Sequence, residues 1–119
     1  MDTPSSGLGA RKLRILLANE PRAYREAIAQ ALHQLRPDVE IETAEPPDLD
    51  TSIRQFVPDM VICSEATDTV RSNVRVWVEL YPEHNSRSIA NIAGKYEEYA
   101  EIQFSDLLSI VDRTEDLVR

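Results

Sequence analysis

Apolar and polar residues recur along the chain with the periods of buried strands and amphipathic helices. Leu13–Leu17 is apolar except at Arg14, which predicts a buried strand. Apolar residues then recur at the spacing of one helical stripe, and the stripe should end at Arg36 because Pro37 disfavours helical geometry before it. The stripe consists of Tyr24, Ala27, Ile28, Ala31, Leu32 and Leu35.

A polar corner, Ala18 to Pro21, joins this strand to the helix. Proline suits the first helical turn, where its missing N–H has no partner, and Asn19 or Glu20 is expected to cap the free amides. A strand that enters a helix through a short corner is half of a βαβ unit. Such folds bind ligands at this corner.

Shorter patterns predict further strands and helices in the middle of the chain. Val39–Thr43 alternates as a strand with an acidic outer face, and Leu49–Phe56 indicates a short helix capped by Asp48 or a neighbour. Met60–Cys63 is uniformly apolar, which is typical of a central parallel strand covered on both faces. The polar segment 64–73 predicts at most a degenerate third helix.

The last third of the chain departs from simple strand–helix alternation. Val74–Leu80 alternates between apolar and polar or mixed positions, which predicts a strand with one core face and one mixed face. Gly94, between two β-prone runs, predicts a hairpin, and Ser105 is expected to cap a final helix. The residues expected on the mixed face are Arg75, Trp77 and Glu79.

Together these elements predict a three-layer α/β domain over residues 12–119. We expect a flavodoxin-like, mostly parallel sheet with a late β-hairpin. Residues 1–11 are rich in Ser, Gly, Thr and Pro and predict a flexible tail.

Composition and charge narrow the possible partners. Apolar residues make up 42% of the chain, enough for a core, and the net charge of −8 would repel a nucleic-acid backbone. No apolar run approaches the ~20 residues of a membrane helix, and the start lacks a signal peptide, so we expect a cytoplasmic protein without a membrane partner. Cys63, His33 and His84 are scattered, which predicts no metal site and no cofactor.

The order of elements and three segments resemble the receiver domain of bacterial two-component response regulators. RILLANEPRAYREAI is similar to the family's opening strand, acidic corner and first helix. VPDMVICSE is similar to its third strand, and FSDLLSIVD to its final helix. The resemblance covers about Lys12 to Arg113 and implies a role in signal transduction.

The positions that carry receiver chemistry are changed in this chain. Receivers use a carboxylate to attack phosphorus and further acids to hold a divalent cation. The resemblance therefore implies a pseudo-receiver that is not phosphorylated and not an enzyme. The changed positions are Ala18 and Asn19 for the corner acids, Ser64 for the acceptor, Glu79 or Leu80 for the hydroxyl, and Lys95 as a poor substitute for the lysine.

We accordingly expect a non-catalytic, regulatory protein-interaction module. The alternative is a small-ligand or nucleotide sensor at the C-terminal ends of the parallel strands, in a degenerate pocket built from Asn19, Glu20, Ser64 and Glu65. These residues also have plain structural roles, as helix cap and turn residues. An enzyme with Ser64 as nucleophile is the least favoured hypothesis, because no activating base is indicated.

The expected partner is a protein, and a second copy of this chain is one possibility. Aromatic side chains contribute much of the energy of protein interfaces, and three of them fall in the late β region. Trp77, Tyr96 and Tyr99 are therefore the expected interface residues of a homodimer. Ordinary core or hairpin packing explains them equally well.

Overall fold

The computed structural model describes residues 12–80 and 87–118, which form an α/β fold with a six-stranded mixed sheet and four α-helices. The predicted tail at residues 1–11 lies outside the described residues. In chain order the elements are β1 (Arg14–Ala18), α2 (Arg22–Leu35), β2 (Glu40–Thr43), the 3-10 turn η1 (Pro46–Asp48), α3 (Leu49–Phe56), β3 (Met60–Cys63), α4 (Asp68–Asn73), β4 (Val76–Glu79), β5 (Ser88–Ile92), β6 (Lys95–Tyr99) and α5 (Phe104–Val118).

The sheet has the strand order β2-β1-β3-β4-β5-β6. Strands β2, β1, β3 and β4 are parallel, whereas β5 and β6 are antiparallel to their neighbours. The expectation of a mostly parallel sheet therefore holds only for the first half. The reason is chain length: only residues 80–87 separate β4 from β5, too few for the crossover that a parallel connection requires.

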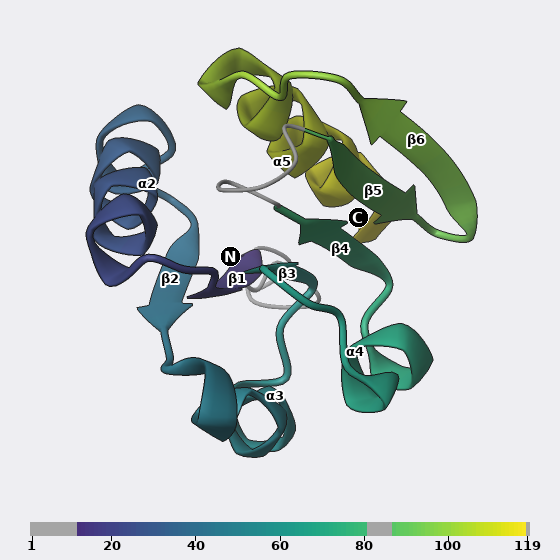
Figure 1. Cartoon of the computed structure of the whole chain (residues 1–119). Helices are drawn as coiled ribbons and strands as arrows, with labels where there is room; N and C mark the ends of the chain where they lie inside the picture. The colour runs from purple at the N-terminus through teal and green to yellow at the C-terminus, as the bar shows by residue number, and fades with distance from the viewer. Residues whose placement is uncertain (1–11, 81–86, 119) are drawn as a thin grey trace, which may run out of the picture.

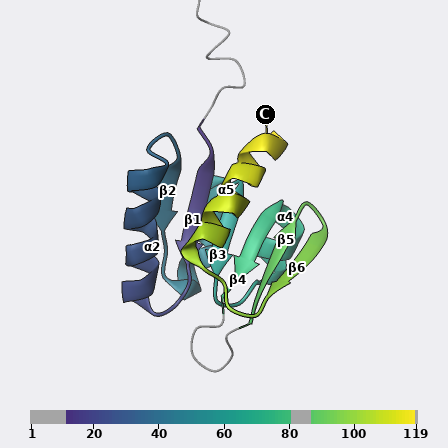
Figure 2. The ribbon, with the colours of Figure 1, turned by 90° about the horizontal axis from the view of Figure 1, so that it is seen from above.

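Helices cover both faces of the sheet. Helices α2 and α5 lie on one side, and α3 and α4 lie on the other (Figure 1), and the turned view shows α2 and α5 side by side along the first face (Figure 2). Alternation within β1 separates the two cores: Ile15 and Leu17 pack with α2 and α5, while Leu16 and Ala18 pack with α3 and α4. The three-layer prediction is correct for the described residues.

The late hairpin is confirmed. Strand β6 pairs antiparallel with β5, and Ile92 lies opposite Lys95 across the turn. Ala93 and Gly94 both have positive φ, 53° and 94°, which is the conformation that a tight two-residue hairpin turn requires. The glycine that indicated the turn thus has a backbone reason to be there.

The stripe predicted for α2 is rotated in the structure. Its buried positions are Arg25, Ile28 and Leu32, whereas Tyr24 and Leu35 are exposed. The expected cap is also wrong, because the N-cap residue is Pro21 and no side chain caps the helix. A charged residue on the buried stripe and an uncapped start make this helix terminus unusual.

Asp48 is the N-cap residue of α3, as expected, but its side chain makes no capping hydrogen bond. Ser105 does not cap α5; instead Asp106 accepts a hydrogen bond from the backbone N–H of Gln103 at 2.8 Å. The short helix α4 is capped by Thr67, whose hydroxyl accepts from the N–H of Val70. Across residues 12–80 and 87–118, no helix combines the length and apolarity needed to cross a membrane.

Candidate functional site at the β1/β3 corner

The C-terminal ends of β1 and β3 meet at one edge of the sheet, where Ala18 lies opposite Cys63. The backbone N–H of Glu20 donates a hydrogen bond of 2.8 Å to the hydroxyl of Ser64. The structure therefore brings together two of the residues that the sequence places in a pocket. Helix α2, which follows β1, and helix α4, which follows β3, lie on opposite faces of the sheet, so the corner is the topological switch point of the parallel strands.

A cavity of about 260 Å³ opens at this corner. Its floor is apolar and its rim carries two exposed carboxylates, Glu20 and Glu65, and no Lys or Arg. Three of the four predicted pocket residues therefore line one cavity, and its charge favours a cationic group over an anionic one. The lining consists of Ala18, Glu20, Pro46, Leu49, Cys63, Ser64, Glu65 and Thr67.

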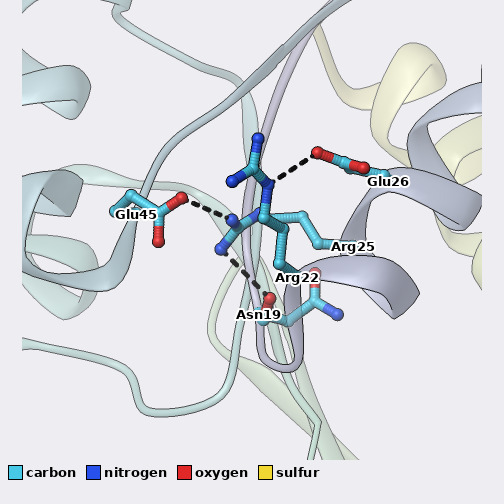
Figure 3. Close-up of polar contacts among 5 residues, drawn as sticks. All are labelled: Asn19, Arg22, Arg25, Glu26 and Glu45. Atoms are coloured by element: carbon cyan, nitrogen blue, oxygen red, sulfur yellow. Dashed lines mark hydrogen bonds and ion pairs between the residues drawn. The ribbon is translucent and has the colours of Figure 1, made fainter.

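Asn19 is not part of this cavity. Its side chain is 0% exposed, and neither atom of its amide has a hydrogen-bond partner among the described residues. It lies below the first turn of α2, where its carbonyl oxygen faces Arg25 (Figure 3). The prediction that Asn19 belongs to the corner pocket is corrected, and it does not cap the helix either.

The thiol of Cys63 in the cavity floor is neutral. Burial, and then the nearby carboxylate of Glu79, raise the pKa of Cys63 to about 12. Because the thiolate is the nucleophilic form, this cysteine is a poor nucleophile and acts as a small core residue. Its position in a buried central strand agrees with the sequence prediction.

Glu79 was expected on a mixed outer face but is buried. Its Oε2 accepts a hydrogen bond of 2.7 Å from the backbone N–H of Ala66 and lies 3.5 Å from Arg71. The carboxylate therefore holds the segment that follows β3, which is a structural role. The sequence did not indicate this role, because strand alternation does not show which outer faces a short helix covers.

The described residues contain no group of three or more His, Cys, Asp or Glu side chains that could hold a metal ion. Lys95 does not replace the receiver lysine. The N–H of Ala93 donates to the carbonyl of Arg75, which places the hairpin turn beside the start of β4. Lys95 follows this turn and therefore lies near the N-terminal ends of β3 and β4. Ser64 follows the C-terminal end of β3, at the other end of the strands.

The three aromatic residues expected at an interface do not form one patch. Trp77 is 1% exposed, covered by the guanidinium of Arg71 at 5.0 Å and by the edge-on ring of Tyr96 at 5.8 Å. Tyr96 itself is 64% exposed. The placement of Trp77 on a surface is corrected, because α4 and the hairpin cover that face of β4.

Tyr99 lies on the other face of β6 and packs against the core beneath α5. Its hydroxyl donates to Glu97, and burial followed by this carboxylate raise the pKa of Tyr99. Arg113 and then Tyr99 hold the pKa of Glu97 below its usual value. Of the three aromatics, only Tyr96 offers a large exposed surface, and the interface stays a prediction.

No protein-family model, no curated protein and no solved structure matches this chain. The resemblance to receiver domains therefore rests on the three segments and on the order of the elements.

Proposed function

We propose that this protein is a non-catalytic regulatory module with a receiver-like fold, which acts by binding another protein. The observation that carries the proposal is the hydrogen bond between Glu20 and Ser64. This contact is formed between neutral groups, at the position where the resemblance implies a carboxylate that accepts phosphate.

The arrangement of the first four strands supports the receiver-like interpretation. The order β2-β1-β3-β4, with helices on both faces, agrees with the first four strands of the flavodoxin-like order and so supports the proposal. The second half differs, because a hairpin stands where an all-parallel relative has a further crossover helix. Strands β5 and β6 are therefore the part that distinguishes this module from an all-parallel flavodoxin-like domain.

The hairpin also supports a role in protein binding. In the described sheet β6 is an edge strand, and edge strands offer backbone groups to a partner. Tyr96 adds an exposed aromatic ring, a residue type enriched in interface hot spots. A second copy of the chain is the first partner to test.

The receiver-like geometry can be tested by restoring the missing acids. Ala18 and Ser64 line the same cavity as Glu20 and Glu65, so Ala18→Asp with Ser64→Asp adds two carboxylates to the two already around it. Oxygen ligands of this kind are what Mg²⁺ prefers. The double variant should gain a Mg²⁺-dependent rise in melting temperature that the wild type lacks.

The matched control is Ala18→Asn with Ser64→Asn, which has the same side-chain shape without the charge. It should fold and show no response to Mg²⁺. If the aspartate variant folds but does not respond to Mg²⁺, the corner does not have receiver-like geometry and the proposal fails.

A second function, a small-ligand sensor, is favoured by the cavity at the switch point. Its apolar floor and its two rim carboxylates fit a small organic amine better than the phosphates of a nucleotide. NMR titration with a short alkylamine, compared with an alcohol of the same length, tests this function. Amine-specific shifts at Glu20 and Ser64 would support it, and equal or absent shifts would contradict it.

A further inference from the structure

A second cavity, of about 310 Å³, lies beside the C-terminal end of β2, between α2 and the start of α3. Figure 3 shows its central residue, Arg25, reaching from α2 towards Glu45. This cavity shares no lining residue with the corner cavity described above. Its lining consists of Arg22, Arg25, Glu26, Thr43, Ala44, Glu45, Asp48 and Ser52.

Arg25 is a buried cation with incomplete pairing. The residue is 2% exposed, and its Nη2 donates to Glu45 at 2.9 Å. Its Nη1 makes a long contact of 3.5 Å with the carbonyl of Asn19, and its Nε has no partner among the described residues. A buried charge is costly unless its hydrogen bonds are satisfied, so this guanidinium has capacity for another acceptor.

The side-chain amide of Asn19 is also without a partner among the described residues, while the backbone carbonyl of Asn19 is the group that faces Arg25 (Figure 3). Nearly all buried polar atoms in proteins have a hydrogen-bond partner. Among the described residues, three buried polar side-chain atoms lack one: Asn19 Oδ1, Asn19 Nδ2 and Arg25 Nε. Of these two residues only Arg25 lines the cavity, so its Nε is the atom that a polar species bound there would satisfy.

The start of α2 adds positive potential at the same place. The helix has 14 residues, no side-chain cap and no acid in its first turn, where Arg22 stands instead. A helix N-terminus has free N–H groups and favours negative charge, so cations there are an unfavourable choice unless an anion is present. Glu45 supplies such a charge from the segment after β2, and its side chain is 54% exposed.

We propose that this cavity binds a phosphate group, and that Glu45 forms an ion pair with the guanidinium of Arg25 when no phosphate is bound. A bound phosphate would accept hydrogen bonds from Arg22, from Arg25 and from the free amides of α2. The hydroxyls of Thr43 and Ser52 also line the cavity and fit phosphate oxygens. This inference is independent of the proposed function and lies outside the receiver-like corner.

The acidic residues of the lining set how strongly the site binds. Glu26 is paired with Arg22 at 2.9 Å, and Glu45 and Asp48 repel an incoming anion. Binding of free phosphate should therefore be weak, and it should depend strongly on Glu45. Removing that carboxylate both frees Arg25 and removes a like charge, so Glu45→Gln should tighten binding by about threefold or more.

The test is an NMR titration with inorganic phosphate, compared with sodium chloride at the same ionic strength. The wild type should show saturable, phosphate-specific shifts of the backbone amides of Arg22 and Ala23 and of the Nε–H group of Arg25. Arg25→Gln should abolish these shifts. Arg22 has an exposed side chain, so its substitution should leave the fold intact. Arg22→Gln should weaken phosphate binding by about threefold to tenfold.

Arg36→Gln is the matched control, because Arg36 belongs to the other end of α2 and pairs with Asp112. It should leave phosphate binding unchanged. The inference is overturned if phosphate and chloride give the same shifts, or if Arg22→Gln and Arg36→Gln affect binding equally. It is also overturned if Glu45→Gln weakens binding, because Glu45 would then be part of the site and not its competitor.

Discussion

The backbone N–H of Glu20 donates to the hydroxyl of Ser64 across 2.8 Å, and this contact joins the ends of β1 and β3. The two residues are separated by 44 positions in the sequence. The contact is between neutral groups, so it holds the corner without a metal ion or a charged acceptor. The contact is therefore expected to stabilise the corner.

Replacing Ser64 with alanine should destabilise the protein by about 1 kcal/mol, because the N–H of Glu20 loses its acceptor. Urea unfolding monitored by circular dichroism measures this change. Ser109→Ala is the control: Ser109 is exposed on α5, and alanine is the better helix former, so its stability should be unchanged or slightly higher. Equal effects of the two substitutions would show that the corner hydrogen bond contributes nothing.

The raised pKa of Cys63 makes stability depend on alkaline pH. Burial raises the pKa of the thiol in the folded protein to about 12, above its ordinary value of 9.0, so the folded state keeps a proton that the unfolded state loses. The contribution is complete below about pH 9 and is lost as the pH rises towards 12, with a slope of at most about 1.4 kcal/mol per pH unit. Unfolding curves of the wild type and of Cys63→Ala, compared from pH 7 upward, should converge over this window.

Parallel curves for the two proteins would contradict the burial of the thiol. The difference between the proteins is the relevant quantity, because tyrosine and lysine side chains also titrate at alkaline pH. Subtracting the variant removes the effect of those groups from the comparison.

Self-association should depend on Tyr96 and on salt. The net charge of −8 repels a second copy, and added salt screens this repulsion, so sedimentation equilibrium should show a dimer that strengthens with ionic strength. Tyr96→Ser should weaken the dimer. Tyr24→Ser, on another exposed aromatic residue, should not. A monomer at both low and high salt would exclude a homodimer through this hairpin.

The parts of the fold that were predictable from the sequence are those with an unambiguous local signal. Met60–Cys63 is apolar throughout, and such a run is typical of a central strand that is covered on both faces. Gly94 marks a turn because its positive φ suits glycine. The corner of Glu20 and Ser64 followed from the rule that parallel strands place their C-terminal ends together.

The errors concern residues whose environment is made by distant segments. Trp77 was expected at a surface, because strand alternation does not reveal that the six-residue helix α4 and the hairpin cover it. Arg25 was omitted from the predicted buried stripe because a charged residue is normally expected on the exposed face of a helix. Its spacing of three from Ile28 and seven from Leu32 is nevertheless that of the buried face. Its partner Glu45 comes from after β2, which no local pattern indicates.

We propose that the β1/β3 corner does not take part in phosphoryl transfer. Treatment with acetyl phosphate and Mg²⁺, followed by intact-mass analysis, tests it directly, with a functional receiver domain treated in parallel. We predict that the receiver gains a phosphoryl group while the mass of this protein stays unchanged, because Ser64 replaces the acceptor carboxylate and the described residues contain no group of three or more His, Cys, Asp or Glu that could hold Mg²⁺. A phosphoryl group found on Ser64 would contradict the account.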